Sequence, residues 1–122
     1  MEHNGFQTRC RLWVEKTFGH QTSETRQKGF RFLEEAVELV ESLGMTRENC
    51  HKIVDYVFDR NSPGEPYQEL GGVMVTLATV AQVNGMNMLT AGSDEITRCE
   101  ANTDKIREKD KRKPDFVKGT KD

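Results

Sequence analysis

The residues best suited to chemistry are four glutamates in one short stretch of the chain. Residues 31–43 read RFLEEAVELVESL and contain Glu34, Glu35, Glu38 and Glu41. Residues three or four positions apart share a face of a helix, so Glu38 lies beside both Glu34 and Glu35. No lysine lies within the stretch to offset the repulsion between these carboxylates. Two interpretations stay open: a solvated acidic helix face, or a site for Mg²⁺ or Mn²⁺, which prefer oxygen ligands.

Helices must position these carboxylates, because apolar residues recur along the chain at a spacing of three or four. Gly19 and Gly44 are typical of residues that follow the end of a helix, and Thr46 is typical of a residue that caps the start of one. No convincing strand of alternating polarity is present, so we expect an all-α fold, a four- to five-helix bundle. The expected helices cover residues 7–18, 24–43, 47 to about 60, 67–84 and 89–111.

Length and composition limit the classes of protein that fit. The 122 residues suit one domain, which we place at residues 1–114, followed by a basic, flexible tail at residues 115–122. Only 34% of the residues are hydrophobic and 31% are charged, which suggests that a partner subunit supplies part of the core. The net charge of −2 gives no general case for nucleic-acid binding.

The sequence lacks the patterns of a secreted or membrane protein, and this predicts its cellular compartment. Three widely spaced cysteines without a CxxC pair argue against a disulfide framework or a zinc site. Residues 1–11 are polar and do not resemble a signal peptide, and no apolar run approaches the roughly 20 residues that span a bilayer. We therefore expect a soluble, cytoplasmic protein with no membrane partner.

Another glutamate, outside this stretch, lies at the start of the fourth expected helix. Glu69 there precedes Gly71 and Gly72, two glycines that each cost about 1 kcal/mol in a helix relative to alanine. Such a pair indicates a close approach, either by a neighbouring helix or by a ligand. Carboxylates that project from facing helices into a bundle are one way to build a divalent-metal site.

The glutamate motifs resemble those of the MazG-like all-α NTP pyrophosphohydrolase superfamily, whose signature is EExxE on one helix and ExxD on the next. The first half is complete here at Glu34, Glu35 and Glu38, whereas Gly72 stands where the family has the aspartate of ExxD. Asp55, on the third helix, is the candidate replacement. The segments RFLEEAVELV, HKIVDYV, GEPYQELGGVMVTLA and KIR, in this order, are similar to the short phage and prophage branch of the superfamily.

This resemblance implies hydrolysis of a nucleoside triphosphate between its α and β phosphates, giving the monophosphate and pyrophosphate. The substrate would be a (d)NTP, with dGTP or dATP among the candidates, in phage nucleotide metabolism or in cleansing of the nucleotide pool. Mg²⁺ or Mn²⁺ would be held by Glu35, Glu38, Glu69 and Asp55, and it would polarise phosphate and acidify water. Glu34 is the candidate general base, although a role as a metal ligand stays open.

Other residues are expected to bind the substrate. Trp13 and Phe18 could stack on the base, against the alternative that each is a core aromatic. Cations are needed for the outer phosphates, and the candidates near the glutamate stretch and on the last expected helix are Arg26, Lys28, Arg31, Lys105, Arg107 and Lys109. Of these we choose Arg31 and Lys105, and the resemblance places Asn102 and Lys105 in this role. The resemblance also implies a homodimer or homotetramer. The alternatives are a catalytically inactive helical dimer that binds a nucleotide or a protein, and a structural bundle whose basic tail contacts nucleic acid.

Overall fold

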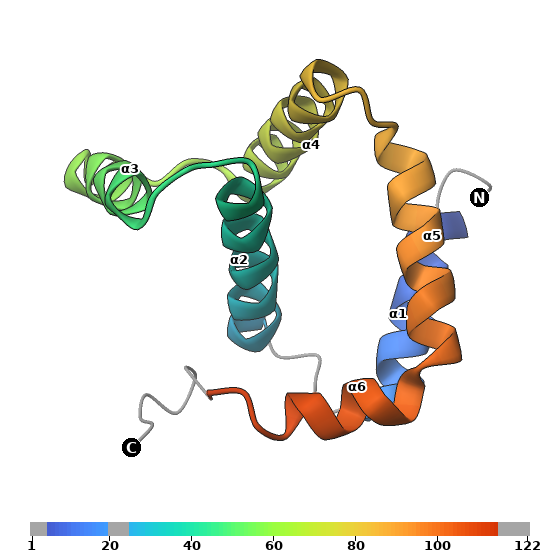
Figure 1. Cartoon of the computed structure of the whole chain (residues 1–122). Coiled ribbons are helices and arrows are strands. Elements are labelled where there is room, and N and C mark those ends of the chain that lie inside the picture. The colour runs from blue at the N-terminus through green and yellow to red at the C-terminus, as the bar shows by residue number, and fades with distance from the viewer. Residues whose placement is uncertain (1–4, 20–24, 115–122) are drawn as a thin grey trace.

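The chain folds entirely into helices over the part that the structure, a computed structural model, describes, namely residues 5–19 and 25–114. The expected tail at residues 115–122 lies outside these residues. No strand is present within them. The helices, shown in Figure 1, are α1 (Gly5–Phe18), α2 (Thr25–Ser42), α3 (Arg47–Asp59), α4 (Pro66–Val83), α5 (Met88–Ala101) and α6 (Thr103–Asp110).

Local sequence signals explain most of the helix ends. Thr46 caps α3 as predicted: its Oγ1 accepts from the backbone N–H of Asn49 at 3.1 Å, while Asn49 Oδ1 accepts from the Thr46 N–H at 3.0 Å. This reciprocal pair satisfies two backbone donors at a helix start. Gly19 and Gly44, predicted as helix stops, have φ of 90° and 103°, the left-handed conformation that glycine adopts at little cost.

The expected single helix over residues 89–111 is wrong, because the chain breaks it at Asn102. Asn102 has φ −129° and ψ 31°, which lies outside helical geometry, and it separates α5 from α6. Its side-chain Nδ2 donates to the carbonyl oxygen of Arg98 at 2.8 Å, and so occupies an acceptor at the end of α5. Asparagine competes well for backbone groups in this way, which disfavours it inside a helix. The chain therefore has six helices in the described part rather than four or five.

Helix α1 contacts both α5 and α6 through side chains spaced along its length. Arg9 Nε donates to Glu100 Oε2 at 2.9 Å, and Trp13 Nε1 donates to Thr103 Oγ1 at 3.0 Å. Farther along, Arg107 Nε donates to the carbonyl oxygen of Thr17 at 2.9 Å. These contacts advance together along both segments. They hold the N-terminal helix against the C-terminal pair.

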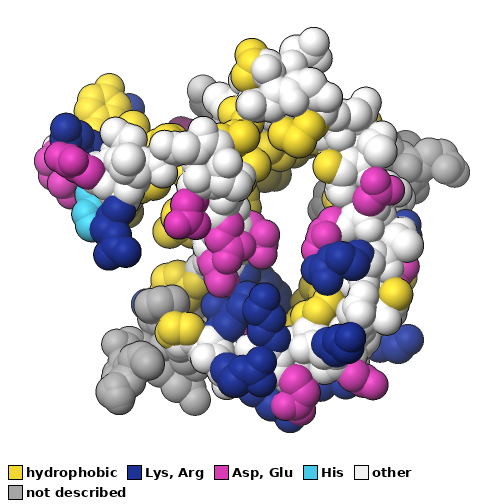
Figure 2. All heavy atoms as spheres, viewed as in Figure 1, with side chains coloured by type: hydrophobic (Ala, Val, Ile, Leu, Met, Phe, Trp, Pro, Cys, Tyr) yellow, Lys and Arg dark blue, Asp and Glu magenta, His cyan; other side chains and the backbone are white. Residues whose placement is uncertain are grey.

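The remaining helices leave the middle of the molecule open. Figure 1 shows α2, α4, α5 and α6 around a central opening, with α3 projecting away from it. Side chains do not fill this opening, as the space-filling view in Figure 2 shows. The pairs of described helices that lie in contact at several positions are α1 with α5, α1 with α6, α4 with α5, and α5 with α6. Helix α2 takes part in none of them.

The hydrophobic core of the described chain is very small. Ala81 and Ile96 are its buried hydrophobic residues, and Thr17, 5% exposed, is its buried polar residue. In contrast, large apolar side chains of α3 and α4 face solvent, including Phe58 at 77% and Tyr67 at 84% exposure. We call this the α3–α4 apolar surface, and it comprises Ile53, Val54, Tyr56, Val57, Phe58, Tyr67, Leu70, Met74, Val75 and Val83. No described helix combines the length and the apolar character that crossing a membrane requires.

Candidate functional site

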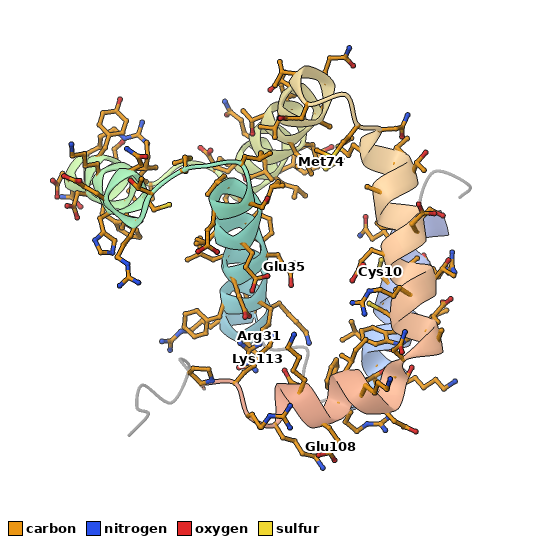
Figure 3. The ribbon with its side chains drawn as sticks, in the orientation of Figure 1. Cys10, Arg31, Glu35, Met74, Glu108 and Lys113 are labelled. Carbon is orange, nitrogen blue, oxygen red and sulfur yellow. The ribbon has the colours of Figure 1, made fainter. Side chains whose placement is uncertain are left out.

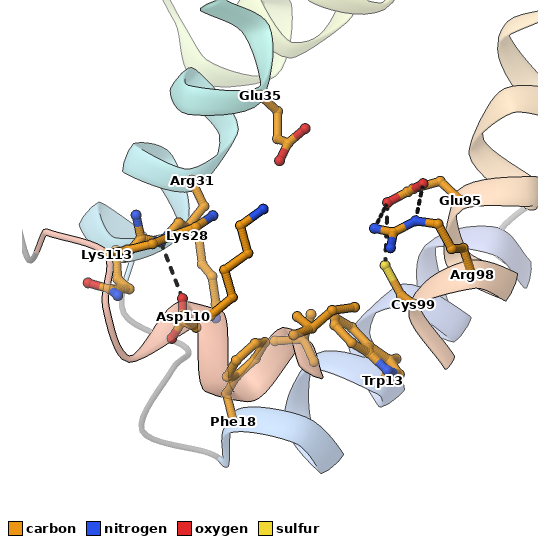
Figure 4. A pocket seen from close by; sticks show the side chains of 14 residues that line it. Trp13, Phe18, Lys28, Arg31, Glu35, Glu95, Arg98, Cys99, Asp110 and Lys113 are labelled. Atoms are coloured by element: carbon orange, nitrogen blue, oxygen red, sulfur yellow. Dashed lines mark hydrogen bonds and ion pairs between the residues drawn. The ribbon is translucent and has the colours of Figure 1, made fainter. Parts of the chain in front are cut away.

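An open cavity lies between α2 on one side and α1, α5 and α6 on the other. Its volume is about 310 Å³, and Figure 4 shows it from close by. It combines the three kinds of side chain that a phosphorylated aromatic ligand would need: aromatic, cationic and carboxylate. The residues that line it are Trp13, Val14, Phe18, Gln27, Lys28, Arg31, Glu35, Glu95, Arg98, Cys99, Ile106, Lys109, Asp110 and Lys113.

The aromatic part of the cavity comes from α1. The rings of Trp13 and Phe18 meet edge to face, with centroids 5.7 Å apart and an interplanar angle of 89°. The hydrogen bond from Trp13 to Thr103 fixes the indole orientation against the start of α6. Both aromatic residues predicted to stack on a base therefore line one cavity, and they also contact each other. A flat apolar ligand could pack against such a pair.

Glu35 is the glutamate of the EExxE motif that lines the cavity, and in Figure 3 its side chain points toward the central opening. Partial burial raises the pKa of Glu35, and the carboxylate of Glu38 raises it further. Glu34 and Glu95 add to this rise, whereas the ammonium of Lys113 opposes it. Burial and the neighbouring carboxylates thus both disfavour the ionised form of Glu35, which a bound cation would favour.

Two of the cations that line the cavity neutralise Glu34. Arg31 Nη1 and Lys113 Nζ each lie 3.3 Å from Glu34 Oε1. Arg31 Nε also lies 3.8 Å from Asp110 Oδ1, and its Nη2 donates to the carbonyl oxygen of Pro114 at 3.3 Å. Figure 3 shows Arg31 and Lys113 meeting at one end of α2. This cluster ties α2 to the chain that follows α6.

Helix α5 supplies an ion pair on the opposite wall. Arg98 donates to Glu95 through two nitrogens, Nη2 at 2.6 Å and Nε at 3.0 Å. The hydrogen bond from Arg98 lowers the pKa of Glu95, so this carboxylate stays ionised. The thiol of Cys99 lies 3.6 Å from the same carboxylate, and burial raises the pKa of that thiol. Figure 4 shows this group facing Glu35 across the cavity.

The structure brings four of the predicted site residues together, namely Trp13, Phe18, Arg31 and Glu35. Glu38 stands one turn beyond Glu35 on the same helix, close enough to influence its titration. Glu34 does not line the cavity, because it is held in the ion pairs described above.

The other predicted residues lie elsewhere. Glu69 borders a depression formed with Phe58, Arg60 and the turn at residues 61–64. Asp55 is exposed on α3, which projects away from the cavity. Asn102 and Lys105 border a separate shallow depression at the junction of α5 and α6.

A divalent cation fits this site only in part. Glu35 and Glu38 offer neighbouring carboxylates that suit a hard cation. However, the fold does not bring Glu69 or Asp55 to them. Within residues 5–19 and 25–114, no three His, Cys, Asp or Glu side chains gather closely enough to hold a metal ion.

Lys28 and Lys109, which the sequence offered among the candidate cations for the phosphates, both line the cavity. Six other polar cavity residues escaped the sequence prediction of the site: Gln27, Glu95, Arg98, Cys99, Asp110 and Lys113. Glu95 and Arg98 had a usable signal, since they are three residues apart and share one face of a predicted helix. Lys113 carried no such signal in a chain with 18 Lys and Arg residues.

The chain was compared with protein-family models, with curated proteins and with solved structures. No family model matches it, and neither does any curated protein or solved structure.

Proposed function

We propose that the chain is a metal-dependent nucleoside triphosphate pyrophosphohydrolase, which converts a (d)NTP, with dGTP and dATP among the candidates, to the (d)NMP and pyrophosphate. The observation that carries the proposal is the cavity that joins Glu35 of the EExxE motif to the Trp13–Phe18 pair and to Arg31. A nucleotide needs an apolar face for its base, cations for its phosphates and carboxylates for a metal ion, and this cavity has residues of all three kinds.

The chain's own residues have separate roles in this proposal. The Trp13–Phe18 pair packs against the base, while Arg31 binds phosphate oxygens. Glu35 and Glu38 would hold Mg²⁺ or Mn²⁺, which supplies charge neutralisation and an acidified water when bound. Glu34 is the candidate base, and its ion pairs with Arg31 and Lys113 must open before it can accept a proton. Phosphate binding by Arg31 would release one of these two partners.

We also propose that the active form is a homodimer or homotetramer. The support is the α3–α4 apolar surface, together with a core limited to a few residues. Closely packed interiors are the rule in folded proteins, and a chain this open needs a second copy to reach that density. A partner copy could also bring Glu69 or Asp55 toward Glu35, since this chain alone does not.

The test is pyrophosphate release from the eight common NTPs and dNTPs, with Mg²⁺, with Mn²⁺ and with EDTA. Glu35→Gln and Glu38→Gln should abolish metal-dependent release. Glu41→Gln is the matched control, because Glu41 lies on the same helix but belongs neither to the EExxE motif nor to the cavity lining. Asp55→Asn reports on whether Asp55 replaces the missing motif aspartate. Release that persists in EDTA, or that survives both Glu35→Gln and Glu38→Gln, would refute the proposal.

One observation favours a second candidate, an inactive helical dimer that binds a nucleotide or a protein. Gly72 stands at the motif aspartate, and Glu69 lies by the turn at residues 61–64, away from Glu35. This candidate predicts saturable nucleotide binding with no release of pyrophosphate from any member of the panel.

A further inference from the structure

Two cavity lysines on different helices form no ion pair within the part of the chain that the structure describes. Lys28 on α2 and Lys109 on α6 line the cavity, and neither forms an ion pair or a hydrogen bond with a residue of the described ranges. The other three cations of the cavity are engaged: Arg31 and Lys113 with Glu34, and Arg98 with Glu95. The two lysines are therefore the charges that remain for a ligand.

The surroundings of Lys28 also favour the binding of an anion. Partial burial lowers the pKa of its ammonium, the carboxylate of Asp110 opposes this change, and the guanidinium of Arg31 lowers the pKa further. Asp110 itself lies 3.8 Å from Arg31 Nε, so it is shared between the two cations. An ammonium that loses part of its hydration without gaining an ion pair of its own is stabilised by an incoming anion.

The lining as a whole favours an anion with several charges. Five cations stand against three carboxylates around the cavity. Lysines bind phosphate as mobile point charges, so two of them on separate helices suit a flexible chain of phosphates better than a single compact group. The aromatic pair on α1 leaves room for a base at the other end of such a ligand.

We propose that Lys28 and Lys109 together bind the terminal phosphates of an oligophosphate, and that this ligand ties α2 to α6. This inference rests on the proposed function for its choice of ligand, but the binding step does not require hydrolysis. Helix α2 lacks extensive packing with the other described helices, and ion pairs between Arg31 and Asp110 and between Lys113 and Glu34 join it to the C-terminal segment. A bridging anion adds a connection at the same junction.

The experiment measures binding of inorganic tripolyphosphate by titration calorimetry, in EDTA and at low salt, to exclude any contribution from metal. Lys28→Ala and Lys109→Ala should each weaken binding about tenfold, the effect of losing one charge-assisted contact. Lys28→Arg should restore most of the affinity. Lys111→Ala is the matched control, since Lys111 directly follows α6, is exposed and does not line the cavity. We expect it to change affinity by less than about twofold.

A second readout tests the tie between the helices. Saturating tripolyphosphate should raise the melting temperature of the wild type, because a ligand of the native state stabilises it. The rise should shrink in Lys28→Ala and Lys109→Ala but not in Lys111→Ala. The inference is overturned if tripolyphosphate does not bind the wild type, or if Lys111→Ala weakens binding as much as Lys109→Ala.

Failure of this inference and failure of the proposed function give different results. Lysine-dependent tripolyphosphate binding without any pyrophosphate release would uphold the site and refute the enzyme. Metal-dependent release with unchanged tripolyphosphate affinity and unchanged KM in both lysine variants would uphold the enzyme and refute the site. A deoxynucleoside monophosphate should bind without dependence on either lysine, which assigns the lysines to the outer phosphates. Loss of monophosphate binding in the same variants would refute that assignment.

Discussion

The proposed self-association predicts that one charge placed on the α3–α4 apolar surface dissociates the protein. A folded monomer of 14.0 kDa has an accessible surface of roughly 6,700 Å² by the usual scaling with mass. This chain exposes 10,164 Å². The excess of about 3,500 Å² per chain is larger than the roughly 1,000–2,500 Å² that one partner buries in an obligate interface, so it leaves ample surface for contacts with a second copy. We choose Leu70→Glu, because Leu70 lies within this surface and is 62% exposed.

The size of the effect separates a monomer from an oligomer. On a monomer, replacing an exposed leucine should change the free energy of unfolding by no more than about 0.5 kcal/mol. At a symmetric interface each copy loses the burial of one leucine, about 1.5–3 kcal/mol, and the same contact occurs twice. The combined loss of about 3–6 kcal/mol raises the dissociation constant about 10²- to 10⁴-fold. Burial of the new carboxylate adds to this loss.

Sedimentation equilibrium over a wide concentration range measures the mass of each protein. Wild type should sediment as a dimer or tetramer, and Leu70→Glu should shift toward the monomer mass at the same concentration. Gln68→Glu is the control, because it adds the same charge two residues earlier on α4, at an exposed polar position. A wild type that stays at 14.0 kDa at every concentration and keeps its helical circular dichroism would refute the reasoning.

Three further predictions concern stability and pH. Thr17→Val should raise the free energy of unfolding by about 1 kcal/mol, which corresponds to about 4 °C in melting temperature. The reason is that the buried Oγ1 of Thr17 has no hydrogen-bond partner among the described residues, and the valine side chain has the same shape. Thr79→Val, which removes a hydroxyl exposed in the chain, should have little effect, and equal effects in calorimetry would contradict the burial argument. Thr46→Ala should cost about 1 kcal/mol in urea unfolding through loss of the capping box, and an unchanged midpoint would show that the cap contributes nothing. The pKa of Glu35 is raised in the native state, so that state keeps its proton where the unfolded chain has lost it. The free energy of unfolding should therefore fall as pH rises from the ordinary glutamate pKa toward the raised value, and urea midpoints for Glu35→Gln should lack this fall. The same fall in the variant would assign it to other groups.

Local chemistry in the sequence was enough to predict most helix limits. Gly19, Gly44 and Thr46 act through the conformation of a few neighbouring residues, so their effect is visible without the fold. The break at Asn102 was missed because the residues on both sides favour a helix. The helix break depends on the side chain of Asn102, which donates a hydrogen bond to the carbonyl oxygen of Arg98.

The site was only partly predictable, for a physical reason. Glu35 and Arg31 belong to one helical stretch, and Trp13 and Phe18 attract attention as aromatics in a polar segment. By contrast, Lys109 reaches the cavity because α6 turns away from α5 at Asn102, and no local pattern reports that turn. Contacts between residues far apart in the sequence depend on the tertiary arrangement, which single-sequence patterns do not contain.

The contacts of α1 with α5 and α6 have a consequence for the order of folding. Its contacts join residues about 90 positions apart, such as Trp13 with Thr103. Closing a loop of that length costs about 4 kcal/mol of chain entropy before any contact offsets it. During synthesis, α1 leaves the ribosome before α5 and α6, and it has no docking surface until these two helices follow. Docking of α1 should therefore be a late step, and nascent chains that end before α5 should leave it accessible to proteolysis.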